Sequence, residues 1–179
     1  MIYFTSDQHF GHRNIIRFCS RPFSTVGEMD AALIWNWNKK VSNADTVYIL
    51  GDLMYRNERP PEYYLGQLNG KKHLILGNHD ESWLGTVAAA EWFESISDQL
   101  TFFDGQRKIA ACHYPMFTWP DQPEAYMLFG HIHNDTGLDI WPSIRASDKL
   151  LNVSVDVNDY APVSFEELAE NNRRFKEAH

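Results

Sequence analysis

Short apolar runs that end abruptly in polar residues recur along the chain. Most are too short for helices and are bounded by turn residues, so they predict β-strands. Asp104-Gly105 is a strong hairpin signal between two of them. The predicted strands span residues 2–6, 46–50, 72–76, 96–103, 107–112, 125–129 and 150–157.

Helical periodicity separates several of these runs. Residues 26–41 place Leu33, Ile34, Trp37 and Val41 on one apolar face, with Trp35 off that stripe. Pro60-Pro61 opens a predicted helix to about residue 68, because proline suits a first helical turn. Further helices are expected at residues 15–18, at 82–92, and from a Ser164 capping box to about residue 176.

The order of these elements indicates an α/β fold. Strands and helices alternate in the first half, as in a parallel sheet, and the second half is richer in strand. In open α/β sheets ligands bind outside the carboxyl ends of the strands. The polar residues that end the runs are therefore candidates for a common site.

Composition restricts the class of protein. The chain has 179 residues, 44% hydrophobic and 22% charged, which fits one globular domain spanning 1–179. The net charge of −8 argues against a general polyanion binder, so no extended nucleic-acid surface is expected. Cys19 and Cys112 lack metal-site spacing and are expected to be buried free thiols. No secretory signal or membrane-length apolar run is visible, so a cytoplasmic location is expected.

Aspartate and histidine residues follow the carboxyl ends of five of the predicted strands. Five of the eight histidines lie there. On an extended segment residues i and i+2 point the same way, so Asp7 with His9, and His131 with His133, each present two ligands to one side. Carboxylate and imidazole together suit Mn, Fe, Zn and related divalent metals. The blocks are Asp7-Gln8-His9, Gly51-Asp52, Gly77-Asn78-His79-Asp80, His113 and Gly130-His131-Ile132-His133.

Each block also has an ordinary interpretation when taken alone. Asp7 is a fitting helix cap, Asp52 a fitting turn residue, and His113 a fitting core histidine. Their joint occurrence, each block directly behind a predicted strand, favours a functional site over coincidence.

In this order the five blocks resemble the signature of the calcineurin-like metallophosphoesterase superfamily: D-x-H, G-D, G-N-H-[DE], H and G-H-x-H. Residues 6–15 further resemble small bacterial and phage members. The resemblance covers residues 7–133 and implies an αββα sandwich of two mixed β-sheets flanked by helices.

The resemblance also implies roles for individual residues. His79 would face the substrate and protonate the leaving oxygen, and Asp80 would orient His79. Asp52 would bridge two metal sites. The first site would be formed by Asp7, His9, Asp52 and His133, and the second by Asp52, Asn78, His113 and His131.

Such a centre implies a phosphoesterase mechanism. Two divalent ions, Mn favoured over Fe, Zn, Ni or Mg, would clamp a phosphate and generate a bridging hydroxide that attacks phosphorus. The neutral Asn78 keeps the summed charge of ions, Asp7, Asp52 and hydroxide at +1, which still attracts an anion. The expected substrates are small or nucleotide-like phosphodiesters. The alternatives are a phosphomonoesterase of the same mechanism, or a non-catalytic metal-binding scaffold.

Substrate contacts are less specified by the sequence. His12, Arg13 and Arg56 are candidates, the arginines weighed against ordinary surface positions. Phe117 and Trp119 form either an aromatic lip or part of the core. No role is assigned to Asn152, Asp156 or Asn158. The expected partner is a small phosphorylated substrate, with no membrane, and the chain as a monomer or small homo-oligomer.

Overall fold

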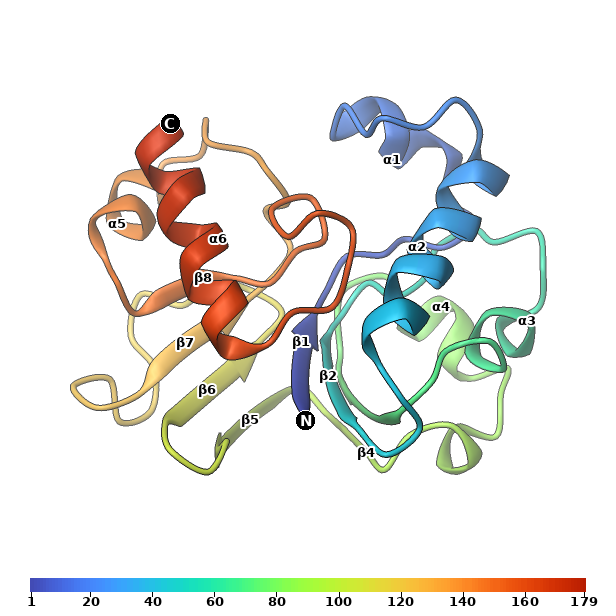
Figure 1. The fold of residues 1–179 in the computed structure, drawn as a ribbon, viewed down its shortest axis with the longest axis horizontal. Helices are drawn as coiled ribbons and strands as arrows, with labels where there is room; N and C mark the ends of the chain where they lie inside the picture. Colours follow the sequence, from blue (N-terminus) through green and yellow to red (C-terminus); the bar gives the residue numbers. More distant parts are fainter.

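Two four-stranded sheets face each other in the computed structural model, which describes residues 1–179 (Figure 1). The pairing is parallel throughout the first sheet, and only β5 is antiparallel in the second. The predicted sandwich is confirmed, with strand pairing of mixed direction in the second sheet. The first sheet contains β1 (Ile2–Thr5), β2 (Thr46–Leu50), β3 (Lys71–Ile75) and β4 (Ser95–Ser97), and the second contains β5 (Gln99–Phe103), β6 (Lys108–Cys112), β7 (Tyr126–Phe129) and β8 (Leu150–Asn152).

Three apolar clusters define the layers. Alternate residues of a strand point to opposite faces of its sheet, and the core follows this period. Phe4 and Ile75 of the first sheet meet Ile109 and Leu128 of the second between the sheets. Neighbouring residues on the same strands pack outward against helices, in one cluster behind the first sheet and one behind the second.

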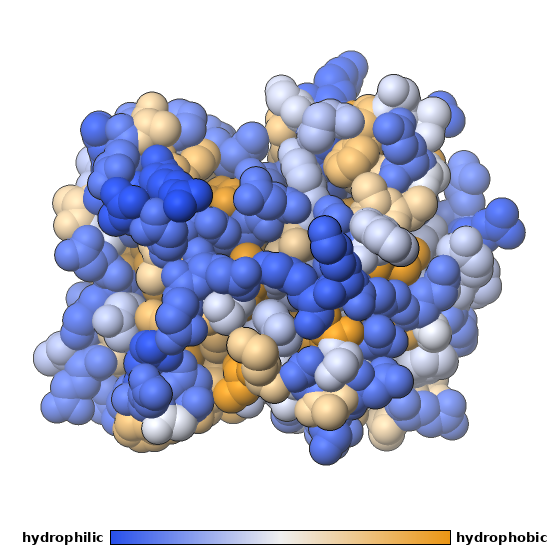
Figure 2. Space-filling view, in the orientation of Figure 1, coloured by the Kyte–Doolittle hydropathy of each residue, from blue (hydrophilic) through white to orange (hydrophobic).

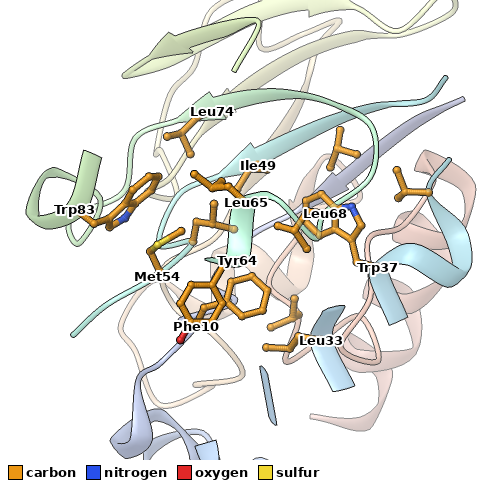
Figure 3. Close-up of a cluster of buried hydrophobic side chains, with 14 of the residues drawn as sticks. Phe10, Leu33, Trp37, Ile49, Met54, Tyr64, Leu65, Leu68, Leu74 and Trp83 are labelled. Carbon is orange, nitrogen blue, oxygen red and sulfur yellow. The ribbon is translucent and has the colours of Figure 1, made fainter. Parts of the chain in front are cut away.

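Most helices cover the outer faces of the sheets, whereas α6 adds Phe165 and Leu168 to the cluster between them. Leu33 and Trp37 of α2 and Leu65 of α3 pack on Ile49 and Leu74 of the first sheet (Figure 3). Trp35 is exposed, as predicted. The helices are α1 (Arg13–Phe18), α2 (Val26–Lys40), α3 (Pro61–Leu65), α4 (Glu81–Leu84), α5 (Trp141–Ala146) and α6 (Phe165–Ala178), with a 3₁₀ turn at Ala89–Glu91.

Several predicted elements were wrong in extent. The strand predicted at 96–103 is two strands, because the chain crosses from the first sheet to the second at Asp98. The helix predicted at 82–92 ends at Leu84, where the Thr86 hydroxyl donates to the Trp83 carbonyl that a longer helix would use. The strand predicted at 150–157 ends at Asn152, and the short helix α5 was not predicted.

The capping box predicted for the last helix is confirmed, and the prediction for the two cysteines is confirmed in part. Ser164 and Glu167 form the predicted capping box at the start of α6. Both cysteines are free; Cys19 is buried, but Cys112 is only half-buried because its side chain lies at the edge of the core. The chain contains no helix with the length and apolarity required to span a membrane.

The loops behind the strands are tied to the core. Phe10, in the loop after β1, is fully buried and stacks on Tyr64 of α3 with ring centroids 5.1 Å apart (Figure 3). The same loop runs beside the one after β2, through hydrogen bonds from Asp7 to Gly51 and from His9 to Asp52. The carboxyl end of β1 points to the gap between α1 and the second sheet in Figure 1.

Candidate metal centre

The Asp52 carboxylate is the centre of the histidine cluster. Its Oδ2 lies 3.5 Å from His9 Nε2, 3.5 Å from His113 Nε2 and 3.9 Å from His79 Nε2. Two ligands about 2.0–2.2 Å from a shared ion lie about 3–3.5 Å apart, so the shorter two separations fit shared coordination. Residues from both sheets therefore converge on one carboxylate oxygen.

The seven predicted ligands divide into two halves around Asp52. Asp7, His9 and His133 bring ligand atoms within 4.8 Å of one another, and we call them the Asp7 half. His113 and His131 form a comparable group with Asp52. Asn78 Oδ1 lies 3.2 Å from His113 Nε2, and we call Asn78, His113 and His131 the His113 half. The structure thus brings all seven together.

A left-handed backbone, and not an extended one, aims these side chains. The φ angles of Asp7 and His9 are 59° and 53°, and those of His131 and His133 are 68° and 50°. Asp52 has φ 53°. The predicted pairs do face one site, but the reason given from strand alternation was wrong. Left-handed residues other than glycine are uncommon and cluster at functional sites.

Glycines allow the carboxylates to approach the neighbouring backbone. A Cβ on Gly77 would lie 2.3 Å from Asp52 Oδ1, and one on Gly130 would lie 2.6 Å from Asp7 Oδ2. Either contact is too short for a side chain. These two motif glycines therefore provide the space in which Asp7 and Asp52 sit.

The residues fit a divalent metal ion. His9 is buried, and its Nε2 has no hydrogen-bond partner although it points at Asp52. Leaving a buried polar nitrogen unpaired costs free energy, and a bound cation would remove that cost. The donors are carboxylate, amide and imidazole, the set that Mn, Fe, Zn and Ni accept.

Arg21 and Asp156 orient His133, and sequence reasoning missed both. The Asp156 carboxylate lies 2.7 Å from His133 Nδ1 and accepts two hydrogen bonds from Arg21, at 2.8 and 2.9 Å. Arg21 also donates to the carbonyls of Asp7 and Gln8. A proton held on His133 Nδ1 leaves its Nε2 free as a ligand. Asp156 lies far along the chain from both partners, so no local motif could reveal this relay.

His12 supports His9 in a similar way. The Nδ1 atoms of the two rings lie 3.2 Å apart, and His12 lies 4.9 Å, centroid to centroid, from the Tyr55 ring. Burial, with help from His79 and Arg21, lowers the pKa of His12 to about 4, so its ring is neutral near pH 7. When His9 Nε2 acts as a ligand, His9 Nδ1 donates to His12 and the hydrogen of His12 resides on Nε2.

Electrostatics in the metal-free chain place protons on two ligand histidines. Against the effect of burial, Asp52 and Asp7 raise the pKa of His113 to about 8. Burial also lowers the pKa of His133, but the charge of Asp7 and the hydrogen bond to Asp156 outweigh burial and raise this pKa to about 11. Burial would raise the pKa of Asp52, but the neighbouring imidazole of His113 lowers it. A metal entering the site must displace these protons.

Asp80 does not orient the His79 ring directly, which differs from the expectation. Its buried carboxylate accepts backbone hydrogen bonds from Gly77, Asp52 and Leu53 and one from the Trp83 indole. Burial raises the pKa of Asp80 to about 6 despite these donors. With its oxygens so occupied, Asp80 fixes the backbone of the two loops.

His79 is held by other groups. Its backbone N–H donates to Asp52 Oδ1 at 2.9 Å, and its ring packs on Tyr55 with centroids 3.9 Å apart. The side chain is 28% exposed, more than those of His9 and His113. His79 therefore lies at the mouth of the cluster with one ring edge accessible.

A cavity of about 930 Å³ opens onto the cluster. It lies between α1 and the loop after β7, and Figure 2 shows a notch in the upper outline between the lobes that carry them. His12 and Arg56 line it, as expected for substrate contacts. Arg13 does not line it and is exposed elsewhere, on a different, smaller pocket.

The Tyr114–Pro123 loop lies outside this cavity. Trp119 is buried in the core behind the second sheet, and its indole donates to the Ala125 carbonyl. Phe117 is 77% exposed and does not line the cavity. Of the two interpretations of this loop, core packing holds for Trp119, and neither residue forms a lip of the site.

Fold and site together define a metal-dependent phosphoesterase. The chain belongs to the calcineurin-like phosphoesterase family, whose model matches residues 1–135. That range contains all seven predicted ligands and His79.

Particular relatives extend the likeness to most of the chain. "Uncharacterized protein MJ1445" of Methanocaldococcus jannaschii is 38% identical over 167 residues, covering 92% of this chain and 87% of the relative. The Gene 66 protein of Mycobacterium phage L5 is 40% identical over 81 residues, 44% of this chain and 39% of the phage protein. Among solved structures, the protein of unknown function AQ665 from Aquifex aeolicus has a TM-score of 0.73 at 28% identity, with 95% and 98% coverage.

Proposed function

We propose that the protein hydrolyses small phosphodiesters at a centre of two divalent metal ions. The observation that carries this is the position of Asp52 Oδ2, 3.5 Å from an imidazole nitrogen of each half. A carboxylate oxygen so placed serves as a bridging ligand. Asp7, His9 and His133 would complete one site, and Asn78, His113 and His131 the other. Manganese is the first candidate, with Fe, Zn, Ni or Mg as alternatives.

The metals, when bound, would polarise the phosphate ester and acidify a water molecule. Residues of the chain would donate the proton and position the substrate. His79 lies at the cavity mouth, 3.9 Å from Asp52, and is the proton donor for the leaving oxygen. Tyr55 keeps the His79 ring in place by packing against it. His12 also lines the cavity, and its Nε2 hydrogen would donate to an oxygen of the bound phosphate.

Two features of the cavity support diesters as the proposed substrates. It extends beyond the metal centre along α1 and residues 131–138, which leaves room for a second group on the phosphate besides the leaving group. Arg56 is the one arginine or lysine that lines it. A terminal phosphate carries two negative charges, and sites for such groups usually gather more guanidinium donors. The net charge of −8 supports a small substrate over an extended nucleic acid.

A paired assay tests the proposal. Purified protein is stripped of metal, reloaded with Mn²⁺, and assayed on bis(p-nitrophenyl) phosphate and on p-nitrophenyl phosphate, with metal content measured in parallel. We expect two equivalents of bound metal and a higher kcat/KM on the diester. A strong preference for the monoester would overturn the diester assignment. Metal-loaded protein without activity on either ester would instead support a non-catalytic scaffold.

A further inference from the structure

One wall of the cavity is apolar, although the metal centre beside it is polar. Ile15 and Phe18 on α1, together with Ile132 and Leu138 in the segment after β7, line this part of the cavity. Phe18 is 63% exposed and Leu138 39% exposed. Single exposed apolar side chains are normal on any protein surface. These four residues differ because they share a cavity with His9, Asp52 and His79. We call them the apolar wall.

The apolar wall is preformed. The Asn134 side chain donates to the Cys19 carbonyl at 3.1 Å, which joins the segment after β7 to the end of α1. The Phe18 ring contacts His12 edge to face, with centroids 6.4 Å apart. The wall is thus held in place by the same residues that flank the metal centre.

Polar side chains border the wall. Asn14, Asp135 and Thr136 line the same cavity and offer amide, carboxylate and hydroxyl groups. A lipid-like or purely aliphatic group would leave these polar groups unpaired, at a cost in affinity. A flat group with an apolar face and a hydrogen-bonding edge would satisfy both the wall and its border.

We propose that the apolar wall binds the base of a nucleoside esterified to the phosphate that the metal centre holds. The base stacks on Phe18, packs against Leu138, and turns its polar edge to the border residues. This inference rests on the proposed phosphodiesterase function, because the phosphate is the anchor that brings the base to the wall. It deepens that function by naming the substrate class as nucleoside phosphodiesters.

Two substrates with the same leaving group test the wall. Methyl p-nitrophenyl phosphate and thymidine 5′-(p-nitrophenyl phosphate) release the same p-nitrophenolate and differ in the group that stays on phosphorus. Base–aromatic stacking predicts that kcat/KM for the thymidine ester exceeds that for the methyl ester by roughly 5- to 100-fold. A ratio near one in the wild-type protein would overturn the proposal.

Substitutions at Phe18 test whether this residue causes the difference in kcat/KM between the two esters. Phe18→Ala should bring the ratio of the two kcat/KM values close to one, and Phe18→Trp should retain it because a flat ring remains. Phe117→Ala is the matched control, since Phe117 is also largely exposed but lies outside the cavity, and it should leave the ratio at the wild-type value. A ratio that survives Phe18→Ala would place the base elsewhere and overturn the assignment.

A binding measurement separates this inference from the proposed function. Calorimetry on the Mn²⁺-loaded protein compares thymidine 5′-monophosphate with methyl phosphate, and needs no turnover. Tighter binding of the nucleotide that Phe18→Ala abolishes supports the wall, even where neither diester is cleaved and the phosphodiesterase function fails. Equal binding of the two ligands overturns the wall, even where both diesters are cleaved.

Discussion

The two halves of the metal centre share Asp52 but are built differently. In the Asp7 half, Asp7 and His9 are buried, and only the His133 side chain is partly accessible. In the His113 half, His113 is buried, but Asn78 and His131 are exposed. Each half has two imidazoles and one oxygen ligand, a carboxylate in the buried Asp7 half and an amide in the more exposed His113 half.

The supporting contacts differ in the same direction. Each ligand of the Asp7 half has a buried partner: Ser6 and the His131 backbone for Asp7, His12 for His9, and Asp156 for His133. In the His113 half, His113 bonds to the Leu50 carbonyl. Partners of this kind raise metal affinity by fixing the ligand's tautomer and direction. We infer that the Asp7 half binds its metal more tightly and that the His113 half exchanges its metal more readily.

The largest effect should come from the shared ligand. Asp52→Asn removes the carboxylate charge from both halves, so metal affinity should fall at both and kcat/KM should drop by on the order of 10³-fold. Metal content by mass spectrometry and diester kinetics measure the two losses. Retention of two tightly bound ions would show that Asp52 is not a bridge.

His79 belongs to neither half, and its loss should leave both intact. His79→Ala should lower kcat by roughly 10²- to 10⁴-fold, because it removes the proposed proton donor. The metal content should remain at the wild-type value. A variant that lost its metals together with its activity would mean that His79 is a ligand.

Asp156→Asn should act on one half alone. The amide oxygen is uncharged and holds the proton on His133 Nδ1 less strongly than the carboxylate, so the metal of the Asp7 half should bind roughly 10- to 100-fold more weakly. Stepwise titration with Mn²⁺ should show the tight site weakened and the other unchanged. Arg21→Lys keeps a positive charge but loses the paired contact, and a smaller shift is expected. Equal weakening at both sites would contradict the difference between the halves.

The smallest effect is in proton release. In the metal-free chain the pKa of His113 is raised to about 8 and that of His133 to about 11, so both hold protons below pH 8 that a metal must displace. Affinity should therefore rise with pH, by about tenfold per pH unit for each proton released. Above pH 8 only the Asp7 half should still release a proton when its metal binds. Calorimetry in buffers of different ionisation enthalpy counts the protons, and loss of release at both halves above pH 8 would contradict the assignment.

The sequence predicted which residues come together, because each of them closely follows the end of a strand. Asp7, Asp52, Asn78, His113 and His131 lie within two or three residues of a strand end, and parallel strands bring such ends together. The strand ends also located the cavity. What periodicity could not predict was the conformation of the ends, since the left-handed φ at Asp7 or His133 depends on contacts between loops.

The supporting residues required the structure. Arg21 lies in a short turn with no motif, and Asp156 lies beyond the end of β8, in a segment predicted as strand. Their contact joins positions 135 residues apart. Asp80 shows the reverse difference: the family resemblance implied that it orients His79, whereas its carboxylate accepts hydrogen bonds from the backbone of neighbouring loops and from the Trp83 indole. Proximity in sequence was a poor guide to which groups touch.

The crossing at Asp98 divides the ligands between the two sheets. Asp7, His9, Asp52 and Asn78 follow strands of the first sheet, and His113, His131 and His133 follow strands of the second. Each half contains residues from both sheets, so the centre exists only when the sandwich is assembled. An ion at 100 times its Kd would then stabilise the whole fold by about 2.7 kcal/mol. Metal supply would thereby affect the stability of the assembled sandwich as well as its activity.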